Sequence, residues 1–112
     1  MSAQLPPPVA AFIKTINAGD TIGFLDSFTP DGVVDDWGRK FCDREAIRAW
    51  SDKELIGAQG QMTVTDVATG DNSVEVTADW RSTHANGLSR FDFTVVGDKI
   101  ALMRISAAHG TG

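Results

Sequence analysis

The second half of the chain consists of segments in which apolar and polar residues alternate, and this period of two most constrains the fold. Every second side chain of a β-strand points to the same face, so alternation of this kind predicts strands with one buried face. Turn-forming residues separate the segments, among them an Asn-Gly pair that favours a tight hairpin. We therefore predict four consecutive antiparallel strands, over 62–67, 73–83, 88–95 and 99–107.

The first half of the chain has a helical pattern instead. Val9, Phe12, Ile13 and Ile16 recur at the spacing of one helix face, which predicts a first helix that ends near Ala18. A glycine follows this segment and is the usual residue just after a helix C-terminus.

Two aspartates predict where further helices begin. Asp20 is placed to cap a short second helix, and Asp43 is placed to cap a third helix that Gly57 or Gly60 ends. Between these helices, residues 29–32 have the composition of a turn. Helices grouped at one end of an antiparallel sheet define an α+β layer fold.

The bulk composition is that of a small acidic protein. The chain has 112 residues, a formal net charge of −5 and a single cysteine, Cys42. We expect one domain over 1–112, with loose tails at 1–5 and 108–112. The sequence has no cluster of basic residues, which argues against binding to nucleic acid or to an anionic membrane. It also has no long apolar run, secretory leader or cysteine pair, so we expect a cytoplasmic protein.

Asp35 and Asp36 adjoin at the end of a short strand predicted after the turn. Strand neighbours point to opposite faces, so one of these two acids is buried if one face is core. Burial disfavours the charged form of a carboxylate, and carboxylates perturbed in this way are a common source of general bases. The alternative is a structural acid that caps the turn or pairs with Arg39, which follows in a second hairpin arm over 39–42.

Three motifs resemble those of a known family. The segment 28–37 looks like a helix exit that leads into an acidic strand, 44–50 (Arg-Glu-Ala-Ile-Arg-Ala-Trp) looks like a third helix, and 90–100 looks like a closing hairpin. Their order and spacing resemble the nuclear transport factor 2-like superfamily, in particular its SnoaL-like and ketosteroid isomerase-like branch. The resemblance extends from Val9 to about Ile105. Asp43 stands where the family usually has glycine.

The resemblance implies a fold, an assembly and a site. The fold is a cone, in which a strongly curved antiparallel sheet packs against three helices around an apolar pocket. Many members form homodimers through the outer face of the sheet, so a homodimer is expected here. The resemblance places Asp36 where related enzymes carry the carboxylate that shuttles a proton, and makes His84 a candidate acid–base partner. The alternative for His84 is a solvated histidine beside a hairpin turn.

Aromatic and methionine side chains suit flat apolar ligands, and a pocket of the family type would use some of them as its wall. For any one of them the alternative is plain core packing. No metal is expected, because the two histidines lie far apart in the sequence, and no cofactor is expected either. The candidates for substrate binding are Trp50, Met62, Trp80, Phe91, Phe93 and Met103.

Three functions are compatible with these features. The first is cofactor-free isomerisation, cyclisation or dehydration of a hydrophobic carbonyl compound, with Asp36 as the base. The second is a non-catalytic module that binds a small ligand or only dimerises, with Asp36 paired to an arginine. The third is epoxide hydrolysis, which requires Asp79 and Arg81 to point into the same cavity as Asp36.

One absence bears on the first function. The chain contains no tyrosine, so the tyrosine that donates a hydrogen bond to the enolate oxygen in steroid isomerases is missing. A serine hydroxyl or a tryptophan N–H would have to replace it.

Overall fold

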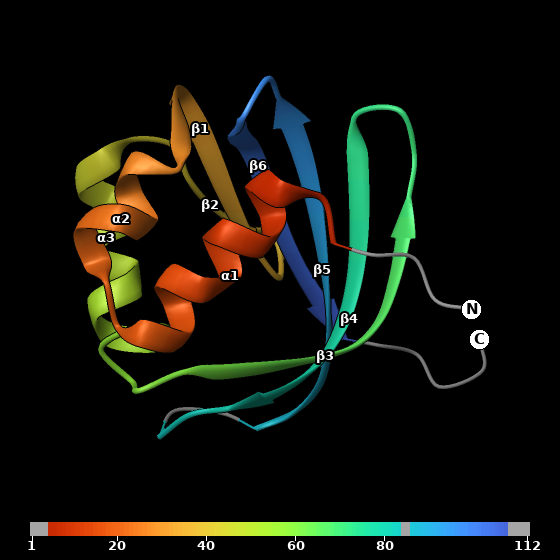
Figure 1. Cartoon of the computed structure of the whole chain (residues 1–112). Helices are drawn as coiled ribbons and strands as arrows, with labels where there is room; N and C mark the ends of the chain where they lie inside the picture. Colours follow the sequence, from red (N-terminus) through yellow and green to blue (C-terminus); the bar gives the residue numbers. More distant parts are fainter. Residues whose placement is uncertain (1–4, 84–85, 108–112) are drawn as a thin grey trace.

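A computed structural model describes residues 5–83 and 86–107 of the chain. Three helices and six strands are assigned in the described residues, and the strands form one sheet with the order β2-β1-β6-β5-β4-β3 (Figure 1). The bounds, in chain order, are α1 Pro7–Ala18, α2 Thr21–Asp26, β1 Phe28–Asp36, β2 Arg39–Phe41, α3 Arg44–Glu54, β3 Gln61–Thr69, β4 Ser73–Arg81, β5 Gly87–Val96 and β6 Lys99–Ala107.

The predicted helix caps at Asp20 and Asp43 and the predicted end of the first helix are confirmed. Gly19 adopts a φ of 71° after α1, a left-handed conformation that glycine allows without a steric penalty. The Asp20 side chain accepts a hydrogen bond of 3.0 Å from the backbone N–H of Gly23 and so caps α2. The Asp43 side chain accepts one of 2.8 Å from Ala46 and caps α3. These caps determine where each helix begins and therefore which of its side chains face the sheet.

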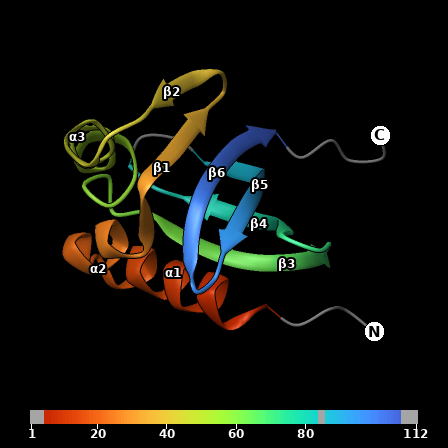
Figure 2. The same cartoon turned by 90° about the horizontal axis from the view of Figure 1, so that it is seen from above.

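The sheet is strongly curved. Its pairings are antiparallel except that of β1 with β6, which is parallel. Register shifts interrupt the β3–β4 ladder between Val64 and Asp66 and the β5–β6 ladder between Thr94 and Val95. Such irregularities bend and twist strands. Figure 2 shows the sheet curling, with the helices gathered on one side of it. This arrangement is the predicted cone-shaped α+β fold.

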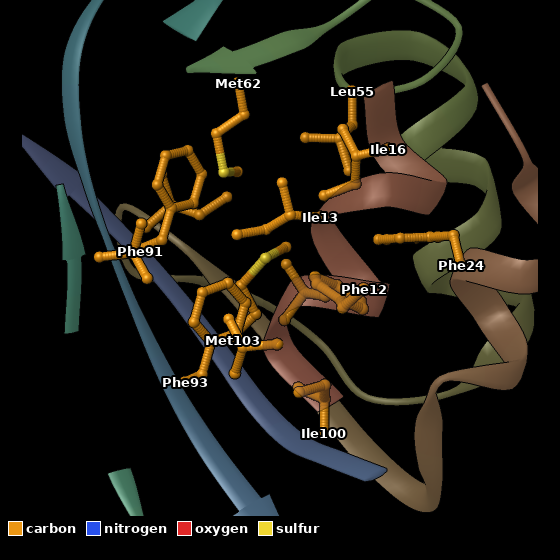
Figure 3. Close-up of a cluster of buried hydrophobic side chains, with 14 of the residues drawn as sticks. Phe12, Ile13, Ile16, Phe24, Leu55, Met62, Phe91, Phe93, Ile100 and Met103 are labelled. Carbon is orange, nitrogen blue, oxygen red and sulfur yellow. The ribbon is translucent and has the colours of Figure 1, made fainter. Parts of the chain in front are cut away.

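The main core lies between α1 and the sheet (Figure 3). The Phe12 ring centroid lies 5.2 Å from that of Phe24, 5.3 Å from that of Phe28 and 5.5 Å from that of Phe93. Burial of one large apolar side chain contributes roughly 1.5–3 kcal/mol, so this cluster is a major source of stability. The side of α1 that faces it consists of residues that are 5% exposed or less: Val9, Phe12, Ile13 and Ile16.

The predicted turn at residues 29–32 is wrong. These residues lie within β1, where Phe28 pairs with Ile100 and Val33 pairs with Leu102. The intervening residues therefore bulge out of the ladder, a position that tolerates proline because no ladder hydrogen bond is lost.

Two further boundaries differ from the prediction. The third helix ends at Glu54, before either predicted glycine, and the N–H groups of Leu55 and Gly57 both donate to the carbonyl of Ser51 at 3.0 Å. The connection between β4 and β5 spans residues 82–86, whereas the predicted strands left residues 84–87 between them.

The predicted tails, 1–5 and 108–112, lie outside the described residues except for Leu5, which is half-buried against the core. In the part of the chain that the structure describes, every helix is too short or too polar to cross a membrane.

Candidate functional site

A pocket of about 280 Å³ lies between the β1–β2 hairpin, the C-terminal end of α3 and the adjoining ends of β4 and β5. This volume lies just below the roughly 300–1,000 Å³ that is typical of ligand sites, and the pocket shares their mostly apolar wall with a few polar groups. Its polar side chains are Asp36, Arg39, Glu54, Asn86 and Ser89. Its apolar wall is formed by Trp37, Trp50, Leu55, Trp80, Leu88, Phe91 and Ile105.

Asp36 is the one buried charged residue in the part of the chain that the structure describes, with 8% of its surface exposed. Its burial follows from strand parity, because Asp36 and the fully buried Val34 lie on the same face of β1. The prediction that one acid of the pair is buried is therefore confirmed. Asp35 points the other way and its Oδ1 accepts a hydrogen bond of 2.8 Å from the Gly38 N–H, which stabilises the hairpin turn.

The Asp36 carboxylate has two hydrogen-bond donors, and both reach the same oxygen. The indole N–H of Trp50 donates to Oδ2 at 3.1 Å, and the Arg39 guanidinium donates to Oδ2 through Nη2. Trp50 reaches the site from the buried side of α3, whereas Arg39 returns to it on β2 directly after the turn. Among the described residues, none is seen to donate to Oδ1.

Arg39 lies between two carboxylates. Its Nη2 is 2.7 Å from Glu54 Oε1 and its Nη1 is 3.1 Å from Glu54 Oε2, in addition to the contact with Asp36. Hydrogen bonds to Glu54 and then to Asp36 raise the pKa of the Arg39 guanidinium above its ordinary value. The Arg39 side chain is 54% exposed, so this ion-pair cluster forms the solvent side of the pocket.

Aromatic rings extend from this cluster in two directions. The Arg39 guanidinium carbon lies 5.8 Å from the centroid of Phe41, and the Phe41 ring stacks on Trp50 at 5.7 Å. On the other wall, the Trp80 and Phe91 centroids are 6.1 Å apart. All three tryptophans of the chain line the pocket.

The structure divides the six predicted substrate-binding residues into two groups. Trp50, Trp80 and Phe91 line the pocket, and their role in substrate binding stays a prediction. Met62, Phe93 and Met103 do not line the pocket that the described residues form. They are 3% exposed or less and lie in the core between α1 and the sheet (Figure 3). The alternative of plain core packing is therefore correct for these three.

The other predicted residues are His84 and the Asp79–Arg81 pair. His84 lies outside the described residues. The side chains of Asp79 and Arg81 are 40% and 71% exposed, and Arg81 Nε lies 3.2 Å from Asp79 Oδ2. This pair is absent from the wall of the pocket that the described residues form, so the condition set for epoxide hydrolysis by Asp79 and Arg81 is not met.

Sequence reasoning missed several residues of the site, and Glu54 is the one with a readable signal. Trp50 and Glu54 are four residues apart on α3 and therefore share a helix face. A buried aromatic residue that is followed one turn later by an acid indicates a helix face that is apolar along its length and polar at its C-terminal end. Leu88 and Asn86 have no comparable signal in the sequence.

A second hollow, of about 480 Å³, lies beside α2, the start of α3 and the start of β1. Its charged groups are paired with each other or with the backbone, because Arg44 bonds Asp26 at 2.8 Å and the Lys99 ammonium donates to the Asp26 carbonyl at 2.7 Å. It contains no buried charge in its described wall. Within the described ranges, no group of three or more His, Cys, Asp or Glu side chains is placed to hold a metal ion.

Comparison with known proteins agrees with this architecture. The chain belongs to the SnoaL-like domain family, whose model matches residues 9–106. The fold is that of the nuclear transport factor 2-like superfamily, including its ketosteroid isomerase-like proteins. No curated protein matches the chain.

Solved structures with low sequence identity share the fold. A candidate polyketide cyclase from Sinorhizobium meliloti is 22% identical over 91% of this chain and 95% of its own, with a TM-score of 0.80. SalBIII, an epoxide hydrolase/cyclase-like enzyme of pyran ring formation in salinomycin, is 21% identical over 90% and 88%, with a TM-score of 0.81. A protein of ketosteroid isomerase-like fold from Catenulispora acidiphila, solved with trimethylamine, is 18% identical over 92% and 86%, with a TM-score of 0.76.

Proposed function

We propose that the chain is a small-molecule pocket protein that catalyses cofactor-free proton transfer on a hydrophobic carbonyl compound, with isomerisation, cyclisation or dehydration as the outcome. The observation that carries this proposal is Asp36, a residue that is 8% exposed, at the wall of a largely aromatic pocket. A positioned carboxylate in such a site can take a proton from a carbon next to a carbonyl group. The likeness in fold to a candidate cyclase and to a cyclase-like enzyme supports this class of reaction.

The two oxygens of Asp36 have different roles in this mechanism. Oδ2 accepts the hydrogen bonds from Trp50 and Arg39, which orient the carboxylate. We assign Oδ1 as the atom that takes the proton from the substrate carbon and returns it to another position. Since the pKa of Arg39 is raised, its guanidinium remains protonated and acts as a fixed charge rather than as a proton donor.

The substrate oxygen needs a hydrogen-bond donor when negative charge develops on it. The Trp50 N–H is already bonded to Asp36, which leaves Asn86 and Ser89 as polar candidates on the pocket wall. The Asn86 Oδ1 accepts a 2.9 Å hydrogen bond from the Ser82 N–H, so its NH2 group is the donating end of the side chain. We assign Asn86 as the first candidate for this role and Ser89 as the second.

One observation favours the non-catalytic alternative. Asp36 is paired with Arg39, and an arginine-paired carboxylate is the arrangement expected of the binding function. In that alternative the Asp36–Arg39–Glu54 cluster only orients the polar end of a bound ligand, and no bond is made or broken.

Hydrogen–deuterium exchange distinguishes the two functions without knowledge of the natural product. We suggest 2-tetralone as the probe, a flat bicyclic ketone with acidic C–H groups beside its carbonyl. Exchange of these protons in D2O is followed by proton NMR, with and without the protein. Binding is followed separately through quenching of tryptophan fluorescence, since all three tryptophans line the pocket and the chain has no tyrosine.

Asp36→Asn is expected to lower the protein-dependent exchange rate by about 10²-fold or more, the usual contribution of a general base. Quenching should persist, because the amide keeps the shape of the side chain and an acceptor for Trp50. Asp79→Asn is the matched control, an exposed carboxylate outside the pocket wall, and should exchange like the wild type. Quenching without any protein-dependent exchange would refute catalysis and support the binding function. Exchange unaffected by Asp36→Asn would exclude Asp36 as the base.

A further inference from the structure

Trp37 is the most exposed large apolar side chain in the described part of the chain, at 66%. The other two tryptophans, Trp50 and Trp80, are 4% and 8% exposed. Trp37 follows the last residue of β1 and forms the hairpin loop with Gly38. Its side chain lines the rim of the pocket directly after Asp36.

The backbone at this position is unfavourable for a tryptophan. Trp37 has a φ of 56° and Gly38 a φ of 90°, and positive φ at both central residues is the mark of a type I′ hairpin turn. Asn-Gly is the preferred pair for this turn, because left-handed conformations are costly for bulky residues. The turn is held by the Trp37 N–H, which donates to the Ile105 carbonyl at 3.2 Å, and by the bond from the Gly38 N–H to Asp35. Neither bond uses the indole.

A second exposed apolar residue lies on the same pocket. Leu88 on β5 is 50% exposed and lines the pocket with Trp37. Ile22 and Val96, the other exposed large apolar residues of the described chain, do not line it. Exposed apolar groups that gather at a concave site mark a surface that a ligand covers.

We infer that Trp37 is a specificity-determining residue, whose indole covers the flat apolar part of a ligand that extends beyond Asp36 to the rim. This inference rests on the proposed function. It predicts selection by ligand size, because a ring that fills only the inner pocket does not reach Trp37, whereas a bicyclic ligand does. Strained backbone that persists at a site without a packing gain is consistent with such a functional role.

Trp37→Asn tests the inference, because function and stability should change in opposite directions. It creates the preferred Asn-Gly turn and should raise Tm by about 2–4 °C. It should also raise the Kd for 2-tetralone by about 5- to 10-fold, the loss expected for one aromatic contact. The Kd for cyclohexanone should stay within about 2-fold of the wild-type value, since a single ring in the inner pocket does not contact Trp37. Kd is measured by ligand-observed NMR, which does not depend on the fluorophore that is removed.

Ile22→Gln is the control, since it removes an exposed apolar residue that does not line the pocket, and it should change neither Kd. A Trp37→Asn protein that is less stable than the wild type and binds 2-tetralone equally well would show a structural role and overturn the inference. Equal weakening for both ketones would also overturn it, because the selection by size would be absent. Failure of the wild type to bind either ketone would reject the proposed pocket function, and the inference would fall with it.

Discussion

In the ion pair between Arg39 and Asp36 the carboxylate is buried and the guanidinium is exposed, so loss of either partner should change stability by a different amount. Removal of the guanidinium in Arg39→Met leaves Asp36, with an 11% exposed side chain, dependent on the single Trp50 N–H. Breaking a fully buried pair costs about 3–5 kcal/mol, and an exposed pair contributes about 0.2–1 kcal/mol. Because the Arg39 side chain is 54% exposed, solvent screens the pair and the cost falls between these limits. We expect Arg39→Met to destabilise the protein by about 2–3 kcal/mol.

The opposite deletion should cost much less. Asp36→Asn loses the attraction to Arg39, but it also removes a charge that folding takes out of water, and Arg39 keeps Glu54 as a partner. The two effects offset each other, so we expect a change of about 0–1 kcal/mol. In the double variant the unpaired buried charge no longer exists. Arg39→Met should therefore cost about 1–2 kcal/mol less in the Asp36→Asn background than in the wild type.

Urea unfolding at pH 7 provides the measurement, with tryptophan fluorescence as the signal and the free energy of unfolding obtained from the midpoint and the slope. Glu54→Gln is the control, because it removes only the outer pair and should cost no more than about 1 kcal/mol. Equal costs for Arg39→Met and Asp36→Asn that simply add in the double variant would refute the reasoning. Such a result would mean that the carboxylate is hydrated and that the cluster is an ordinary surface network.

Two other substitutions separate the pocket wall from the core. A Cβ at Gly60 would lie 2.1 Å from Cη2 of Trp80 and 2.9 Å from the Leu55 carbonyl oxygen. Gly60→Ala should therefore push the indole into the pocket and raise the Kd for 2-tetralone. The free energy of unfolding in urea should fall by about 1–3 kcal/mol. Unchanged ligand binding would show that Trp80 does not limit the pocket. Met103→Ala leaves a cavity at a fully buried core position and should lower the free energy of unfolding by about 2–5 kcal/mol. The folded variant should bind 2-tetralone with the Kd of the wild type. A higher Kd would show that Met103 contributes to the pocket wall.

The fold was predictable because its signals are local and repeated. The helix faces follow from residues such as Phe12, and the caps follow from Asp20 and Asp43, each of which acts within one turn. The alternation of the later strands likewise determines which side chains face the helices. The irregular parts were not predictable, because the bulge at 29–32 depends on how β1 pairs with β6, a strand about 70 residues away.

The site was predictable only in part for the same physical reason. Parity alone places Asp36 on the buried face beside Val34. Parity does not separate Phe91, which reaches the pocket, from Phe93, which lies on the same face of β5 but opposite α1. That distinction depends on which helix covers each end of the strand, and this is set by the curvature of the sheet.

The segment from Asp35 to Arg39 shows how one hairpin builds the Asp36–Arg39 ion pair at the pocket wall. Strand parity turns Asp36 inward, and the two-residue loop brings Arg39 back beside it three positions later. The positive φ of Trp37 directs that residue away from the strand and towards the rim. The two groups that contact these side chains, Trp50 and Glu54, lie on α3, and their spacing lets a single helix supply both the N–H donor to Asp36 and the second carboxylate for Arg39. The position of α3 relative to this hairpin therefore determines both the Trp50 hydrogen bond to Asp36 and the Glu54 ion pair with Arg39. Variants at Asp43, which caps α3 without touching the pocket, can change that position while every group of the site is retained.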